Sequence, residues 1–486
     1  MTTHQERWLI VGAGPAGIHL AHLLAKRGHR DVVLLEQGDR FGGKSETLEF
    51  NGHPQEMGTC YLHPGYALLQ SLLEEFNITE SFKPGGREGR RDMFSDLVPM
   101  NSGGHVPGLG EWLLQMVRRH KRSQWFQWAP NIFQAVSVLR AVRKYKKLHR
   151  SLLGEYQYTL PSEPSDEGLK AIDMTFLQWL EGHGLQALIP MFKLTTTAQG
   201  YGSLETVPTL YGLWWNTPLV IDAFMRSSRD KDQPVLSMLE HGYSAVWNTL
   251  VEQHDMRIEL GVDIQRIDRS DGIQISALQN GERREFSGTR LVLACNLKSV
   301  LATLSDPEPE EIELFSNLVT QELTSTLVRT APQSGANCIA YWPDVLRTGN
   351  PGRLYSRRDT ALCKNPDAAP DENVWACYQY SDHFDPAAAS LRLLQLRQEL
   401  ANQGVEVKEI LAQRHWAYFT RFTQDGINRR YPWRLWRLQG HANTWYAGAS
   451  ACFESVNDIM NYNQMLVDRL LIEQPVMSSV SLEAAA

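Results

Sequence analysis

Six residues near the start of the chain, Gly12-Ala13-Gly14-Pro15-Ala16-Gly17, fit the pattern G-x-G-x-x-G, and the acid Glu36 follows them. In this pattern the first glycine permits a tight turn, the second lets a pyrophosphate approach the backbone, and the third allows close packing of helix on strand. A carboxylate at the position of Glu36 accepts hydrogen bonds from the hydroxyls of an adenosine ribose, and it would repel the 2′-phosphate of NADP. The chemistry indicated is the binding of a dinucleotide.

Regular elements are expected on both sides of this glycine turn. Residues 7–11 predict a short buried strand, residues 18–27 a helix that ends at Gly28, and residues 31–35 a second strand. The start of the helix would offer free N–H groups and a partial positive charge to the phosphates. Strand, glycines, helix, strand and acid in this order predict a Rossmann-type unit.

A second glycine segment follows the acid closely. The run that contains Gln37, Gly42, Gly43 and Lys44 resembles the second diphosphate-contacting segment of the glutathione-reductase-like flavoproteins, above all the flavin amine oxidase superfamily. The resemblance implies FAD as the cofactor, with the backbone N–H groups at 42–43 and the Lys44 ammonium facing its diphosphate. Without the resemblance, the segment is a glycine turn beside a solvated lysine.

The resemblance extends to segments far along the chain. Met57-Gly58-Thr59 is similar to the segment where the backbone of the family approaches the flavin ring, and Ile264 lies in a run (257–267) like the strand that contacts the adenine. Gly448 resembles the glycine after the family's closing strand. The last helix, with Val456 and Asn457 at its start, would direct its N-terminus at the flavin edge that becomes negative on reduction.

Three observations refine the expected cofactor chemistry. The family has an acid after the closing glycine, where this chain has Ala449, so one contact to FAD is weakened. No second strand–GxGxxG–helix unit follows, so the flavin would be reduced by the substrate itself, as in an oxidase, a dehydrogenase or an isomerase. No cysteine matches the flavin-linking residue of monoamine oxidases, which implies non-covalent FAD.

A narrower resemblance concerns the substrate. Gln199-Gly200-Tyr201-Gly202, Tyr211 and the run Trp416–Phe419 resemble FAD-containing polyunsaturated fatty acid double-bond isomerases and cyclopiazonate dehydrogenase-like enzymes. The likeness implies that Tyr201 and Tyr211 line the pocket near the flavin, and Trp416 and Tyr418 are candidates for its aromatic walls. No catalytic acid or base can be assigned.

The same likeness places a basic pair where the isomerases bind the carboxylate of a fatty acid. Arg91 is the second residue of this pair. A planar guanidinium suits that task because it pairs with a carboxylate through two parallel hydrogen bonds. The alternative to a carboxylate-binding role is a basic pair on the surface without a function, which the sequence supports at least as well.

The length of 486 residues predicts two or three domains. We expect an α/β fold in which a Rossmann-type FAD-binding domain (1–80, 240–300 and 438–475) is interleaved with an α+β substrate-binding domain (81–239 and 301–437). A helical subregion at 111–150 is rich in tryptophan and basic residues. It is either a solvated helix face, which we favour, or a surface for an anionic membrane or an acidic partner.

The bulk composition narrows the functional class. A net charge of −7 and a pI near 6.1 argue against nucleic acid as a partner. The six cysteines are scattered without a C-x-x-C pair, which predicts a reducing compartment and neither a disulfide framework nor a metal site. No stretch has the roughly 18–20 apolar residues of a membrane span, so the sequence predicts a cytoplasmic protein.

The leading hypothesis from the sequence is an FAD-dependent oxidoreductase that takes hydride from a small lipophilic or amine-bearing substrate. Dehydrogenation ranks above isomerisation of an unsaturated fatty acid, because more relatives dehydrogenate. A different class, the escort proteins of prenylated GTPases, shares the fold without catalysis. The electron acceptor and the oligomeric state are left open.

Overall fold

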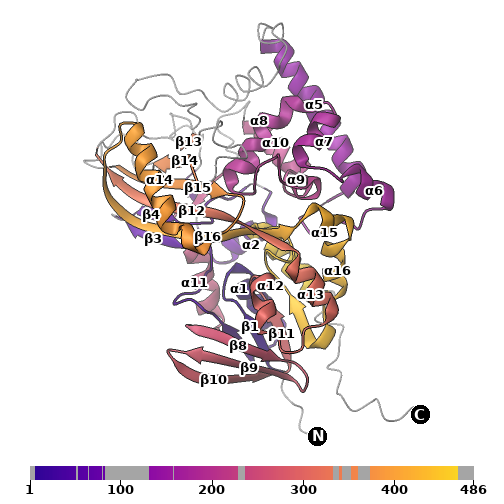
Figure 1. Ribbon diagram of the computed structural model, residues 1–486, viewed down its shortest axis with the longest axis vertical. Helices are drawn as coiled ribbons and strands as arrows, with labels where there is room; N and C mark the ends of the chain where they lie inside the picture. The colour runs from indigo at the N-terminus through magenta and orange to yellow at the C-terminus, as the bar shows by residue number, and fades with distance from the viewer. Residues whose placement is uncertain are drawn as a thin grey trace.

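The computed structural model of the chain (Figure 1) describes residues 6–50, 53–63, 65–78, 80–82, 131–156, 158–227, 236–331, 339–341, 352–359 and 373–468. Arg91 and the first half of the predicted helical subregion, 111–130, lie outside these residues.

A parallel sheet of five strands carries the dinucleotide turn. Its strands, in spatial order, are β17 (Thr444–Tyr446), β11 (Arg290–Leu293), β1 (Trp8–Val11), β2 (Val32–Leu35) and β7 (Arg257–Glu259). Helix α1 (Pro15–Lys26) packs between α17 (Val456–Leu466) and α11 (Tyr243–Gln253). Strands β1, β2 and β11 are largely buried, as expected inside a parallel sheet, whereas the edge strand β7 is partly exposed. Segments from both ends of the chain therefore meet in one Rossmann-type sheet.

The run 257–267, expected to form one strand, is divided into two. Gly261 has a φ of +67° and turns the chain between β7 and β8 (Val262–Asp268). Strand β7 joins the parallel sheet, while β8 starts a three-stranded antiparallel sheet with β9 (Ile273–Gln279) and β10 (Glu282–Gly288). The division arises because a glycine tolerates the left-handed conformation that this sharp turn requires.

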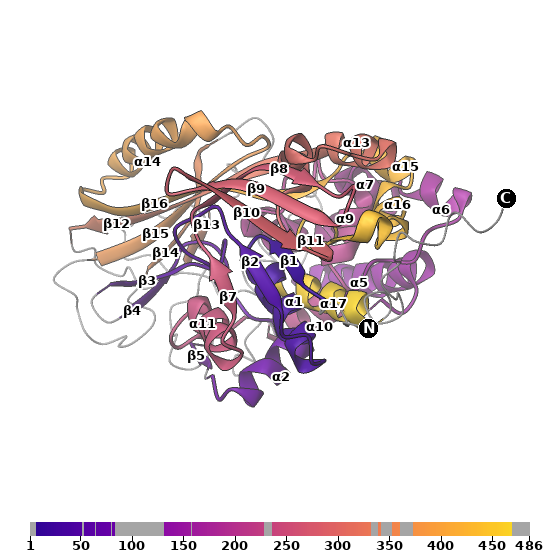
Figure 2. The ribbon, with the colours of Figure 1, turned by 90° about the horizontal axis from the view of Figure 1, so that it is seen from below.

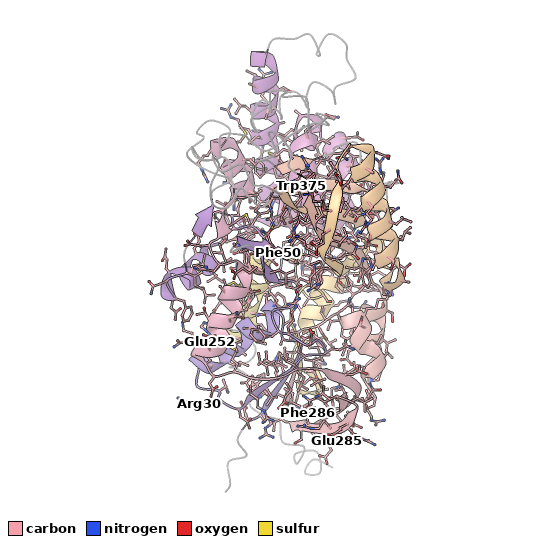
Figure 3. The ribbon with its side chains drawn as sticks, turned by 90° about the vertical axis from the view of Figure 1, so that its left-hand side faces the viewer. Arg30, Phe50, Glu252, Glu285, Phe286 and Trp375 are labelled. Carbon is pink, nitrogen blue, oxygen red and sulfur yellow. The ribbon has the colours of Figure 1, made fainter. Side chains whose placement is uncertain are left out.

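A second large sheet is antiparallel and has the order β13 (Ile339–Tyr341), β14 (Leu354–Asp359), β15 (Asn373–Ser381), β12 (Leu318–Thr330) and β16 (Val407–Phe422). Helix α14 (Ala389–Asn402) lies along its outer face (Figure 2), where Leu396 and Leu400 pack on Trp375. Figure 3 places Trp375 far from Glu285 and Phe286 of β10, at the other end of the molecule.

A helical layer covers the remaining side of the molecule, at the upper right of Figure 1. It consists of α5 (Asn131–Leu153), α6 (Asp166–Ala171), α7 (Phe176–Gly182), α8 (Ile189–Thr195), α9 (Thr209–Trp215) and α10 (Pro218–Ser227). The smaller elements are β3 (Thr47–Phe50), β4 (His53–Glu56), α2 (Ala67–Glu75), β5 (Glu80–Phe82), β6 (Met238–Leu239), α12 (Leu297–Val300), α13 (Pro309–Ser316), α15 (Gln424–Asn428) and α16 (Tyr431–Arg437). None of the described helices is long and apolar enough to cross a membrane.

Helix α5 contains the described half of the basic subregion and is amphipathic. Its buried side includes Tyr145 and His149. Its exposed side carries five cations: Arg140, Arg143, Lys144, Lys147 and Arg150. The solvated basic face favoured from the sequence is therefore present in the described half of the subregion, and the alternative of a surface for an anionic membrane or an acidic partner stays a hypothesis.

Candidate functional site

The glycine turn after β1 has no room for a Cβ at Gly12 or at Gly17. Gly12 has a φ of +104°, and a Cβ added to it would lie 2.8 Å from the carbonyl oxygen of Ala294 in the neighbouring part of the sheet. A Cβ on Gly17 would lie 2.0 Å from the carbonyl oxygen of Gly12. The spacing of the two glycines thus follows from the close approach of strand, turn and helix.

The first turn of α1 opens onto a second backbone segment. Gly14 is the N-cap residue of α1 and provides no side-chain cap, so the N–H groups of the first turn are available to a ligand. A Cβ on Gly43 would lie 3.0 Å from the Cα of Gly14, whereas a Cβ on Gly14 would find its nearest neighbour at 3.7 Å. Two glycine segments therefore form one cradle of backbone, which suits a diphosphate.

Glu36, at the end of β2, is held in place by backbone donors. Its Oε2 accepts the N–H of Ala13 at 2.9 Å, and its Oε1 accepts the N–H of Gly38 at 2.8 Å. The carboxylate lines the same cavity as Gly12 and Gly14. This position fits a carboxylate that binds the ribose hydroxyls of a dinucleotide.

Lys44 lines the same cavity as Gly14 and Gly43, and its expected contact to a diphosphate stays a prediction. Its ammonium forms an ion pair with Glu454, and it lies 5.5 Å from the centre of the Tyr418 ring. Glu454 is buried and also accepts the N–H of Thr420 at 3.2 Å. The ion pair is stabilised electrostatically, because a buried carboxylate is a stronger partner for the ammonium than solvent.

Glu454 is a cavity residue that the sequence did not reveal. It lies five positions beyond Ala449, where the resemblance expects an acid, and both residues line the cavity. The signal available in the sequence is an acid directly before the N-cap of the last helix, where an anion is stabilised by the helix dipole. The cavity wall therefore carries a carboxylate near its C-terminal segment in spite of Ala449.

The last helix begins beside the cavity, as expected. Gly448 has a φ of +84°, and Ser455 caps α17 by accepting the N–H of Asp458 at 3.0 Å. Asn457 is fully buried, and neither atom of its side-chain amide has a hydrogen-bond partner among the described residues. Burial raises the pKa of the Asp458 carboxyl to about 7, although the indole N–H of Trp214 donates to it at 3.1 Å.

These segments enclose one cavity of about 390 Å³. The residues of the predicted cofactor set that line it are Gly12, Gly14, Pro15, Ala16, Glu36, Gly43, Lys44, Gly58, Thr59, Gly448 and Val456. The cavity extends from the dinucleotide turn to the start of α17 and has a further part with aromatic walls. Its form suits an extended cofactor with a substrate space beside it.

Other residues of the predicted cofactor set lie behind this wall: Ala13, Gly17, Gln37, Gly42, Met57, Ile264 and Asn457. Gln37 turns outward and donates to Asp263 at 3.1 Å, while the N–H of Gly42 donates to the carbonyl of Ala13 at 2.8 Å. Met57 is buried against Leu327 and Ala376. These positions shape the backbone of the cavity and do not present side chains to it.

The aromatic part of the cavity contains two of the pocket residues expected from the sequence. Tyr201 and Tyr418 line it, with ring centres 5.7 Å apart and nearly parallel planes. Burial raises the pKa of both phenols, so both are neutral hydrogen-bond donors at neutral pH. Further wall residues are Trp215, Tyr355 and Tyr378.

The structure corrects the expectation that Tyr211 and Trp416 line the pocket. The hydroxyl of Tyr211 accepts the N–H of Phe422 at 3.0 Å, and its ring stacks on Trp214 behind the wall. The indole of Trp416 donates to the carbonyl of Met57 at 2.6 Å. Both polar groups thus have protein partners, which is how buried tyrosine and tryptophan are ordinarily satisfied.

FAD fits the described residues. The cradle formed by Gly14 and Gly43 presents backbone to the cavity, the first turn of α1 has no side-chain cap, and Glu36 lines the same space. Among the described residues, no group of three or more His, Cys, Asp or Glu side chains is placed to hold a metal ion.

Comparisons with known proteins support this assignment. Residues 15–333 match the family model described as flavin containing amine oxidoreductase. The chain is 22% identical over 493 residues to the polyenoic fatty acid isomerase of Ptilota filicina, across 94% of this chain and 93% of that protein. It is 32% identical over 272 residues to the L-glutamate oxidase precursor of Streptomyces viridosporus, across 52% of this chain and 39% of that protein.

Solved structures show the same fold. The CLA-producing fatty acid isomerase from P. acnes superimposes with a TM-score of 0.74 at 22% identity, covering 97% of this chain and 100% of that chain. A putrescine oxidase bound to putrescine superimposes with a TM-score of 0.62 at 16% identity, covering 96% of this chain and 99% of that chain.

Proposed function

Because the chain belongs to the flavin-containing amine oxidoreductases and its cofactor is FAD, we propose that it is a flavin-dependent double-bond isomerase of a lipophilic, unsaturated substrate. The chemistry that FAD supplies when bound is hydride transfer from one carbon and back to another. The residues of this chain bind and orient the substrate and exclude water from the reacting carbons.

The aromatic wall of the cavity is the observation that carries the proposal. Tyr201 contacts Trp215 with ring centres 4.7 Å apart and Tyr418 at 5.7 Å, and all three residues line the cavity. Such a surface favours an apolar, unsaturated chain, and it excludes the water that would intercept a cationic intermediate. Lys44 and Glu454 neutralise each other on the same wall.

The sequence alone favours dehydrogenation over isomerisation. The similarity to a fatty acid isomerase over nearly the full length of the chain favours isomerisation instead. The isomerase of Ptilota filicina aligns with 94% of this chain, whereas the L-glutamate oxidase precursor aligns with 52%. The two reactions share hydride abstraction and differ in whether hydride returns to the substrate. An isomerase must therefore retain its intermediate, which suits a cavity with close-packed walls.

Anaerobic mixing of the yellow holoenzyme with linoleate tests the proposal. We expect a shift in double-bond position, no lasting bleaching of the flavin and, in a parallel aerobic sample, no consumption of O2. Lasting bleaching would identify a dehydrogenase instead. Bleaching by amines, together with no reaction of linoleate, would refute the lipophilic substrate class. A protein purified without flavin would favour the escort class.

A further inference from the structure

His63 lines the substrate cavity, and one nitrogen of its buried ring has no hydrogen-bond partner among the described residues. It lies between β4 and α2, directly after the β-bridge that joins Leu62 to Ser237, and its side chain is only 5% exposed. The ring lines the cavity, together with Val220, Phe224 and Leu236. The ring of Tyr66, whose centre lies 5.9 Å from that of His63, belongs to the same wall.

The backbone determines which ring nitrogen carries the proton. The Nδ1 of His63 accepts the N–H of Gly65 at 3.0 Å, so in the neutral ring the proton is on Nε2. Nε2 is buried and has no hydrogen-bond partner among the described residues. A buried donor without a partner destabilises a protein, so a donor of this kind on a cavity wall is typical of a ligand contact.

The electrostatic surroundings select the ligand. Burial, and then the positive charge of Arg226, lower the pKa of His63 to about 4, so the ring is neutral at physiological pH. A neutral Nε2–H group can only donate, so its partner must supply an acceptor, such as a carboxylate oxygen. An ammonium group cannot meet this condition, because it has no acceptor for Nε2–H.

We propose that the Nε2–H group of His63 binds a carboxylate oxygen of the substrate, and that the cavity therefore takes a long-chain carboxylic acid in preference to an amine. This inference rests on the lipophilic substrate proposed above. Val220 and Phe224 contact the first carbons of the chain, and the aromatic wall at Tyr201 and Tyr418 holds the unsaturated part. His63 is a binding and specificity residue that takes no part in hydride transfer.

Three ligands of equal chain length test the proposal in the FAD-loaded protein: dodecanoate, dodecanol and dodecylamine. Binding is followed by the perturbation of the flavin absorption spectrum. We expect wild type to bind dodecanoate most tightly and dodecylamine least. His63→Leu removes the donor and should weaken the binding of dodecanoate about 10- to 100-fold, the range for a hydrogen bond to a charged group. His63→Gln keeps a donor, and its affinity for dodecanoate should fall only a few-fold.

A matched control is His149→Leu. His149 is also a buried imidazole with one unpaired ring nitrogen and a pKa lowered by burial, but it does not line the cavity. Its replacement should leave the affinity for dodecanoate unchanged. Equal dodecanoate affinity in wild type and His63→Leu would overturn the role of His63 and leave the isomerase proposal intact. Tight binding and flavin bleaching by dodecylamine would overturn both proposals.

A second measurement does not depend on the variants. In protein with ¹⁵N-labelled histidine, we expect the His63 proton on Nε2 without ligand, and a change of the Nε2 chemical shift when dodecanoate binds. A proton on Nδ1, or an Nε2 signal that dodecanoate leaves unchanged, would refute the contact. This readout would detect the hydrogen bond even if His63→Leu failed to fold.

Discussion

The ammonium of Lys44 and the carboxylate of Glu454, 410 residues apart in the chain, form an ion pair on the wall of the cavity. One partner follows the second glycine segment, and the other precedes the last helix. The pair therefore joins the two segments that the cofactor must bridge, and it keeps the net charge of this part of the wall near zero.

Replacement of Glu454 should change the redox properties of the flavin. Glu454→Gln keeps an acceptor for the N–H of Thr420 but leaves the charge of Lys44 uncompensated. A cation near the cofactor favours the reduced, anionic flavin, so we expect the midpoint potential to rise by roughly 20–50 mV. Spectroelectrochemical titration measures the change. Glu285→Gln, an exposed position at the far end of the molecule (Figure 3), is the control and should have no effect.

Two glycines of the dinucleotide turn should respond differently to substitution. Gly14 has room for a Cβ, so Gly14→Val should fold and yet retain at least about tenfold less flavin, because the side chain occupies the cradle. Gly17→Ala would place a Cβ 2.0 Å from the Gly12 carbonyl and should lower the melting temperature as well. The ratio of flavin to protein absorbance and a thermal melt separate the two effects. A Gly14→Val protein as yellow as wild type would contradict the placement of the diphosphate.

A histidine pair between α1 and α11 should make stability depend on pH. The Nδ1 of His22 lies 2.8 Å from the Nε2 of His254, and burial, followed by the charges of His254 and Lys26, lowers the pKa of His22 to about 4. The unfolded chain then binds more protons than the folded one. The free energy of unfolding should therefore fall as pH decreases from about 6.5 to about 4, by roughly 1–3 kcal/mol from this residue.

The measurement for this prediction is a set of urea unfolding curves at several pH values for wild type and His22→Gln. The stability of the variant should depend less on pH over this interval. The difference between the two proteins is the decisive quantity, because Glu56 and Asp458 have pKa values raised by burial to about 7 and contribute a dependence of opposite sign. Parallel curves for the two proteins would contradict the prediction.

The flavin should be released by acid precipitation. Cys60 and Cys295 both line the cavity, but burial raises the pKa of each thiol to about 12. The nucleophilic thiolate is therefore scarce at neutral pH, and neither cysteine should form a bond to the cofactor. We expect all yellow colour in the supernatant after precipitation. A yellow pellet would show a covalent link, and Cys60→Ser or Cys295→Ser would then identify the residue.

The sequence predicts the glycine turn and the acid after the second strand, because the determinants of these features are local. The spacing of Gly12, Gly14 and Gly17 is imposed by one turn between adjacent elements, and Glu36 ends the next strand. The substrate half depends on tertiary contacts that no short pattern encodes. His63 and Glu454 lie on the wall only because distant segments place them there.

The aromatic residues of β16 also show that tertiary contacts determine which side chains line the cavity. Tyr418 and Trp416 both belong to β16 and differ by two positions, yet only Tyr418 lines the cavity. Trp416 and Tyr418 pair with Leu323 and Gln321 of β12 in regular register, so they lie on the same face of the strand. A period of two therefore predicts their shared face, but it does not predict that the Trp416 indole is covered by the segment of Met57, whose carbonyl accepts its N–H.

The separation of 410 residues between Lys44 and Glu454 also has a consequence for biosynthesis. At translation rates of about 5–20 residues per second, the N-terminal cradle exists for roughly 20–80 s before the residues that complete the cavity have been made. Stable uptake of FAD must therefore wait until the last helix has left the ribosome. Flavin availability should thus affect the yield of this enzyme after translation and not during it.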